Sequence, residues 1–246
     1  PQGVWLSNSF IFIRDLFVLI LFWIVANWYI HKRYQDGDRK RASLLIVTYA
    51  VAFSLIGFDL VMALDPHWYA TMFGGYFFIS ALYAAIAGWT LFSILKEKTS
   101  GDRLQDMGKL IFAFSILTAY LMICHFLPIW YENLPAETRF VVPRLNFQPW
   151  NIVSVFLFAA IYFGPLLMLL TQWSKRNRVY LGIVSSFILF SLWIERWWLI
   201  QPDFYPRKIQ FSIQELAISI AFAGVFAFII DRYSSSIKIP EGEKSE

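Results

Sequence analysis

Long apolar runs dominate this sequence and limit what it can fold into. The stretches 43–64 and 179–200, for example, are mostly apolar over their whole length. About 20 such residues are what an α-helix needs to cross the hydrocarbon core of a bilayer. Only 15% of the 246 residues are charged, compared with roughly a quarter in soluble domains. The chain is therefore predicted to be an integral membrane protein.

The length test predicts an all-α bundle of about seven transmembrane helices. We expect a single transmembrane domain over residues 1–246, with 232–246 as a polar tail outside the membrane. The segment 131–148 contains Pro135 and Pro143 and is expected to be an amphipathic or irregular connection. The predicted spans are 8–30, 43–64, 68–95, 106–130, 149–173, 179–200 and 210–231.

Lysine and arginine collect on one side of the predicted bundle. The joints after the first, third and fifth spans are rich in them, whereas the opposite joints hold few. Because cytoplasmic loops carry the excess of positive charge, the N-terminus is predicted to be periplasmic and the tail cytoplasmic. Six tryptophans then fall near the outer ends of the spans, where amphipathic rings prefer to lie: Trp5, Trp68, Trp130, Trp150, Trp197 and Trp198.

The basic residues and the single cysteine exclude several classes of protein. The net charge of +4 does not indicate nucleic-acid binding, because the basic residues lie in short loops between apolar spans. Cys124, the one cysteine in the sequence, cannot by itself hold an iron–sulfur cluster, a structural zinc or an intramolecular disulfide. A haem with two histidine ligands would need His67 and His125. We expect instead that this chain alone binds no cofactor or metal.

Ionisable residues inside the spans are the main functional candidates, because a charge in the bilayer costs several kcal/mol unless it is paired or hydrated. At about 1.5 Å per residue, a group of them falls in the outer half of the membrane, where a bundle could bring them into one hydrated pocket. Arg14 could instead only neutralise Asp59, Glu195 or Glu215 as a structural pair, and Arg196 could only reach outward to the headgroups. The group comprises Arg14, Asp15, Asp59, His125, Glu195, Arg196 and Glu215.

A second set of polar residues lies toward the inner side of the fourth span. Asp106 and Lys109 stand three residues apart, and Tyr120 returns to nearly the same helix face. This face could carry a hydrogen-bonded track. The alternative is that Asp106 caps the helix start and Lys109 reaches the lipid headgroups.

Four strings of residues together resemble a known family. The strongest is FDLVMALDPHWYATMFGGYFF at 58–78, which joins two spans through a short turn. It is followed in the expected order by DMGKLIFAFSILTAY at 106–120, IWYENLPAET at 129–138 and LWIERWWLIQP at 192–202. Together they resemble the NrfD-like membrane subunit of alternative complex III, of the ActF type.

The resemblance implies a subunit of a quinol:cytochrome c, or quinol:terminal oxidase, oxidoreductase in the bacterial inner membrane, inactive as an isolated chain. Menaquinol or ubiquinol would be the substrate of the complex, and haem c and iron–sulfur clusters would be held by other subunits. The expected partners are a second NrfD-like membrane subunit, an iron–sulfur or molybdopterin-like peripheral subunit, and multihaem and monohaem cytochrome c subunits.

The resemblance also implies a proton-transfer role without a catalytic residue or metal ligand in this chain. The outer half of the predicted proton path comprises Asp59, His125, Glu195, Arg14 and Glu215, the inner half comprises Asp106, Lys109 and Tyr120, and the family-like turn contains Asp65 and His67. Two alternatives remain. One is a quinone-interacting NrfD-like anchor of a molybdenum-enzyme complex, and the other is an independent secondary transporter.

Overall fold

The computed structural model describes residues 6–33, 39–65, 68–96 and 99–236. Within these ranges the ordered elements are all helices, and no strand occurs. Seven helical segments among the described residues are long and apolar enough to cross a membrane. The predicted fold class, a multi-pass helical membrane protein, is confirmed at this level, while the side on which each terminus lies stays a prediction.

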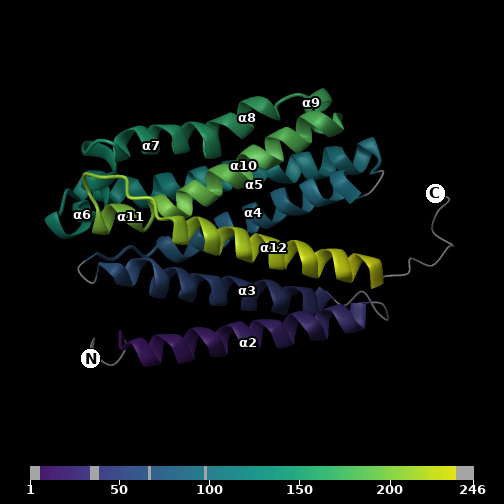
Figure 1. Cartoon of the computed structure of the whole chain (residues 1–246), viewed down its shortest axis with the longest axis horizontal. Helices are drawn as coiled ribbons and strands as arrows, with labels where there is room; N and C mark the ends of the chain where they lie inside the picture. Colours follow the sequence, from purple (N-terminus) through teal and green to yellow (C-terminus); the bar gives the residue numbers. More distant parts are fainter. Residues whose placement is uncertain (1–5, 34–38, 66–67, 97–98, 237–246) are drawn as a thin grey trace. The chain divides into compact units, whose positions relative to one another are not determined.

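Six of the spans are long helices and one is interrupted (Figure 1). The long helices are α2 (Asn8–Arg33), α3 (Arg39–Leu60), α4 (Phe73–Lys96), α5 (Gly101–Glu132), α10 (Arg178–Trp198) and α12 (Ile213–Ser236). The interrupted span consists of α7 (Trp150–Leu157), the π-helical η2 (Phe158–Phe163) and α8 (Gly164–Met168). The short elements are η1 (Met62–Leu64), α6 (Pro135–Asn146), α9 (Gln172–Arg176) and α11 (Gln201–Phe204).

The chain divides into two compact units, residues 1–208 and residues 209–246. In the first unit, α4 packs against both α5 and α10, and the α7–η2–α8 segment completes this core. Helix α3 packs on α4, and α2 packs on α3. The second unit contains α12. The fully buried residues Tyr83, Ile111, Ile161 and Ile188 show that the core lies among the four central segments.

The span predicted over 149–173 is present as Trp150–Met168, but its helix is interrupted. The α-helical pattern stops at Leu157, continues as a π-helix to Phe163, and ends with α8 at Met168. Gly164 donates its N–H to the carbonyl of Ala159, five residues earlier. Pro165 has no N–H to donate to the preceding turn, and π-turns commonly accommodate such a break.

The connection 131–148 is more ordered than expected. Helix α5 ends at Glu132 and is capped by Asn133, which adopts a left-handed conformation (φ 49°) and donates its N–H to the carbonyl of Ile129 at 3.0 Å. Helix α6 then begins with Pro135, a residue suited to the first helical position because the N–H it lacks would have no partner there. The spans also shift at their ends, since α4 begins only at Phe73 and α5 already at Gly101.

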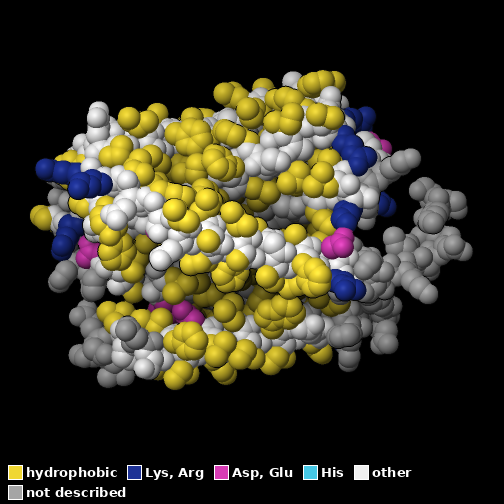
Figure 2. Space-filling view, in the orientation of Figure 1, with side chains coloured by type: hydrophobic (Ala, Val, Ile, Leu, Met, Phe, Trp, Pro, Cys, Tyr) yellow, Lys and Arg dark blue, Asp and Glu magenta, His cyan; other side chains and the backbone are white. Residues whose placement is uncertain are grey.

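The surface of the spans is apolar, as a lipid environment requires. In Figure 2, hydrophobic side chains spread over the visible helices, while Lys and Arg gather near helix ends. Phe12, Ile46 and Leu167 are examples of strongly exposed apolar residues. The expected outer belt of tryptophans is only partly present, because Trp68, Trp150 and Trp198 are buried in the core while Trp130 is exposed. Trp5 lies outside the described residues.

Candidate functional site

Among the described residues, the most buried carboxylate belongs to Glu195, near the end of α10. Its exposed fraction is 1%. Its Oε1 atom accepts a hydrogen bond from the Tyr76 hydroxyl of α4. The hydroxyls of Tyr76 and Tyr162, the latter in η2, are 3.0 Å apart. Because the Tyr76 proton is used toward Glu195, Tyr162 is the donor to Tyr76. We call these three residues the Glu195 cluster.

Two local features bring the tyrosines to Glu195. Tyr162 lies inside the π-turn, whose wider winding changes the direction of the side chains that follow it. Tyr76 begins a line of buried hydroxyls along one face of α4, at the spacing of a helix face. The line comprises Tyr76, Ser80, Tyr83, Thr90 and Ser93. The core of this unit is therefore lined with hydroxyl groups along much of the length of α4.

Arg196, the next residue after Glu195, points into the first unit. Its Nη2 donates to Ser80 Oγ at 2.6 Å, and its Nε lies 3.6 Å from Glu195 Oε2. Its guanidinium also lies over the Phe77 ring, 4.4 Å from the ring centroid. The alternative in which Arg196 only reaches outward to headgroups is therefore wrong. The positive charge therefore stands beside the buried carboxylate.

Arg14 and Asp59 join α2 to α3. Arg14 Nε donates to Asp59 Oδ2 at 2.8 Å, and its Nη2 forms an ion pair with the same carboxylate. Both side chains are largely buried. Among the carboxylates considered for Arg14, the structure selects Asp59. Asp15 and Asp59 also line one cavity of about 560 Å³.

His125 of α5 lies in an aromatic cage. The ring centroids of Trp68, Phe73, Phe126 and Phe140 are between 5.4 and 6.0 Å from that of the imidazole. The histidine is buried, and among the described residues its Nε2 has no hydrogen-bond partner. His67 lies outside the described residues, so the two-histidine haem stays untested.

Asp106, Lys109 and Tyr120 share an exposed face of α5. Lys109 Nζ lies 2.8 Å from Asp106 Oδ1, and the two side chains are 57% and 72% exposed. Tyr120 is also exposed. Asp106 does not cap the helix, because Ser100 is the N-cap and accepts a hydrogen bond from the Arg103 N–H. The capping part of that alternative is therefore wrong, while the reach of Lys109 to the headgroups stays a prediction. A proton track on this face would need cover from another molecule.

Glu215 is the remaining member of the predicted outer path. It lies in the first turn of α12, in the second unit, so its relation to the Glu195 cluster stays a prediction. In the first unit, the outer-layer residues occupy three places: the Glu195 cluster with Arg196, the Arg14–Asp59 pair and the His125 cage.

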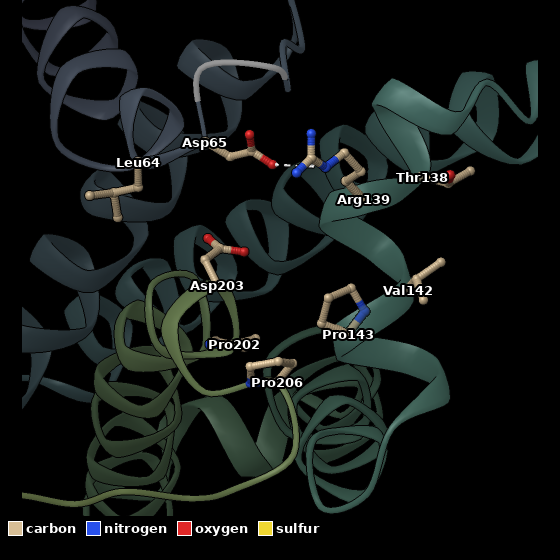
Figure 3. Close-up of a pocket in the computed structure, with 9 residues that line it drawn as sticks. All are labelled: Leu64, Asp65, Thr138, Arg139, Val142, Pro143, Pro202, Asp203 and Pro206. Atoms are coloured by element: carbon tan, nitrogen blue, oxygen red, sulfur yellow. Dashed lines mark ion pairs between the residues drawn. The ribbon is translucent and has the colours of Figure 1, made fainter.

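The family-like turn ends in an ion pair with α6. Asp65 Oδ2 lies 3.7 Å from Arg139 Nε, and Figure 3 shows the pair at the edge of a cavity of about 530 Å³. Asp203 faces the same cavity from α11, opposite Pro143 of α6. The turn is thus tied to α6 at one end of the first unit. We call this the α6 end, and the end that carries α9 the α9 end.

Behind this cavity lies a buried ion pair that sequence reasoning missed. Arg144 of α6 is 0% exposed, and its Nη1 and Nη2 donate to the two Asp203 oxygens at 3.0 and 3.1 Å. The same guanidinium donates to the carbonyls of Phe140 and Leu199 at 2.6 and 2.8 Å. Burial lowers the pKa of Arg144 from its ordinary value, and the Asp203 carboxylate raises it. The residues stand 59 positions apart, and no sequence spacing links them.

Comparison with known proteins does not assign the chain to a family. No protein-family model matches the sequence, and no curated protein matches it. Among the described residues there is also no group of three or more His, Cys, Asp or Glu side chains placed to hold a metal ion. The functional assignment therefore rests on the residues themselves and on the resemblance of the four sequence strings.

Proposed function

We propose that this chain is a membrane subunit of a respiratory quinol-oxidising complex of the alternative complex III type, and that it transfers protons through the Glu195 cluster. The observation that carries the proposal is a carboxylate with 1% exposure, hydrogen-bonded to two buried tyrosines in series. Ionisable residues in membrane spans are costly and commonly mark proton relays. Arg196 beside the carboxylate lowers that cost by offering an opposite charge.

The cluster has the connectivity that a proton relay needs. Glu195 accepts from Tyr76, and Tyr76 accepts from Tyr162. A proton reaching Tyr162 would release the Tyr162 proton to Tyr76, which in turn would pass its own proton to Glu195. Each step breaks one O–H bond and forms another, so no redox partner is needed within this chain. The line of buried hydroxyl residues on α4 runs from Tyr76 through Tyr83 to Ser93, toward the α9 end.

Membership of a larger complex is supported by two features. The four strings resemble subunits that work beside haem- and iron–sulfur-bearing partners, and the single Cys124 leaves such centres to other chains. The exposed Asp106–Lys109 pair and Tyr120 on α5 suit a face covered by another membrane subunit. In this proposal the partners are a second NrfD-like subunit, a peripheral iron–sulfur or molybdopterin-like subunit and c-type cytochromes in a bacterial inner membrane.

The partner assignment is tested by purifying the chain from its native membrane in mild detergent through a tag. Mass spectrometry should identify multihaem cytochrome and iron–sulfur subunits, and visible spectra should show haem c that is reduced by added quinol. A colourless protein that purifies alone would contradict the proposal and favour an independent transporter.

The relay is tested by Glu195→Gln in the purified complex reconstituted in vesicles. Glutamine keeps the shape of the side chain but cannot take up a proton, so proton release per quinol oxidised should fall about tenfold or more. Glu195→Asp should restore part of it. Asp102→Asn is the matched control, because Asp102 is a carboxylate in an exposed surface pair with Arg176. Equal proton release in Glu195→Gln and the control would contradict the relay.

One observation favours a second candidate, a quinone-interacting anchor of a molybdenum-enzyme complex. An apolar cavity of about 610 Å³ lies between α5, α6 and η2, with Phe126, Trp130 and Phe158 among its lining. Asn133 and Asn146 add neutral hydrogen-bonding groups, a combination typical of small-molecule sites. Crosslinking by a photoreactive quinone at Trp130, together with a molybdenum-containing partner in the purified complex, would favour this candidate.

A further inference from the structure

The aromatic cage around His125 encloses a polar atom, the Nε2 nitrogen of the imidazole. The Nε2 atom is buried and lacks a hydrogen-bond partner among the residues that the structure describes. Buried polar atoms in native proteins almost always bond to protein or to ordered water, and leaving one unsatisfied costs about 1–3 kcal/mol. The aromatic rings around His125 offer no such bond at Nε2. The missing partner must therefore come from another source.

A cavity beside His125 can supply that partner. It measures about 170 Å³ and is lined by the chain segment before α4, by α5 and by α6. Each water molecule occupies about 30 Å³ of liquid volume, so several fit. The lining includes Thr71, Cys124 and His125, with Glu132 and Glu137 as its two carboxylates. Glu132 is exposed and Glu137 half-buried, which puts the opening of the cavity at the α6 end.

Pro128 adds a second polar group to this cavity. It lies within α5 and has no N–H to donate. The carbonyl four residues earlier, that of Cys124, therefore loses its usual helical partner. Both Cys124 and Pro128 line the cavity. The same place thus holds an imidazole nitrogen and a backbone carbonyl that need hydrogen bonds, a pattern that water satisfies well.

We propose that this cavity is a water-filled vestibule, which connects His125 with the aqueous phase at the α6 end and attracts hydrated cations, protons included. Two acidic side chains lie at the opening of the cavity, Glu132 of α5 and Glu137 of α6. Tyr69 also lines the cavity. Arg144 of α6 lies over the ring of Phe140, which contacts His125, but Asp203 neutralises its charge. The opening is therefore negative, and negative clefts raise the local concentration of cations.

The role of the vestibule as a proton exit rests on the proposed function, because it requires protons to arrive from the Glu195 cluster. Phe73 contacts both the His125 ring and the Tyr76 ring, with centroid distances of 6.0 and 6.3 Å. His125 thus lies one aromatic ring from the Glu195 cluster. As a water-filled, cation-attracting cavity, the vestibule stands on its own geometry and can be tested without any turnover.

Cys124 provides a built-in reporter, because it is the only cysteine of this sequence and lines the cavity. Native membranes are first broken so that reagents reach both sides. Two membrane-impermeant methanethiosulfonates are then added separately, one carrying an ammonium group and the other a sulfonate group. Modification of the Cys124 peptide is followed by mass spectrometry, with Cys124→Ser as the blank. The cationic reagent should react roughly tenfold faster than the anionic one. The double variant Glu132→Gln with Glu137→Gln should bring the two rates close together, whereas Asp102→Asn at the opposite end of α5 should not.

Three results would overturn parts of the inference separately. Labelling of Cys124 by lipid-soluble N-ethylmaleimide but by neither charged reagent would overturn the water-filled vestibule. Equal rates for the two charged reagents in the unaltered chain would overturn the attraction of cations. If His125→Gln kept both the rate of Cys124 labelling and the proton release per quinol, the proton-exit role would be overturned. A loss of proton release in Glu195→Gln would still support the relay in that case. Selective cationic labelling, with reduced proton release in His125→Gln, is the expected result.

Discussion

The Glu195 cluster and the Asp106–Lys109 pair each place a carboxylate near a basic side chain, but the first carboxylate is buried and the second is exposed. Glu195 is 1% exposed and takes its hydrogen bond from Tyr76, whereas Asp106 is 72% exposed and pairs with Lys109 one helical turn away. A buried charge is costly unless its surroundings are arranged for it, while an exposed pair contributes little. The comparison shows that burial, more than the presence of a charge in a span, separates a candidate relay from a surface feature.

The largest effect is expected where a buried charge loses its ionic partner. Asp203→Ala would leave the Arg144 guanidinium uncompensated at 0% exposure. Breaking such a pair typically lowers the free energy of unfolding by about 3–5 kcal/mol. Thermal unfolding of the detergent-solubilised protein checks this. Asp102→Ala, which removes an exposed carboxylate, should change stability by no more than about 0.5 kcal/mol, and a similar loss in both variants would break the comparison.

An intermediate effect is expected inside the Glu195 cluster. Tyr76→Phe keeps the ring in the core but removes the hydroxyl that donates to Glu195. Hydrogen bonds to charged groups contribute about 1.5–3 kcal/mol, and the unfolding free energy should fall by that amount. Tyr131→Phe, which removes the hydroxyl of an exposed tyrosine in α5, is the matched control. If Tyr76→Phe were as stable as this control, the carboxylate would not depend on Tyr76.

The smallest effect is expected at the exposed pair. Lys109→Gln in the isolated chain should change the free energy of unfolding by less than about 0.5 kcal/mol, because both side chains of the pair are mostly exposed. The same substitution in the purified complex sharpens the comparison. A clearly larger loss there would mean that a partner covers this face, as an inner proton track requires, while equally small losses would assign the pair to an uncovered surface.

Most of the fold could be predicted from the sequence because lipid imposes a simple length rule. Apolar runs such as 43–64 and 179–200 became α3 with η1 and α10 with little change in their limits. The length rule cannot predict a change from α-helix to π-helix within an apolar run. Pro165 was a visible sign of a break, but the π-turn that positions Tyr162 depends on how η2 packs against α5 and α10.

The candidate site was predictable in part, for a related reason. Glu195 and Asp59 stood out because carboxylates are rare in apolar spans, and both are buried in the structure. Tyr76 and Tyr162 did not stand out, since tyrosine is common in membrane helices. Arg144 lay in a segment predicted to be an amphipathic or irregular connection. Its burial follows from the long-range contact with Asp203, which no helical periodicity encodes.

The most direct measurement is redox-induced infrared difference spectroscopy of the purified complex during quinol oxidation. If Glu195 takes up and releases the transferred proton, a carboxylic-acid C=O band should appear in the unaltered protein, shift in deuterated water, move in Glu195→Asp and be absent in Glu195→Gln. Asp102→Asn should leave the band unchanged. The same band at full intensity in Glu195→Gln would contradict the assignment of the relay to the Glu195 cluster.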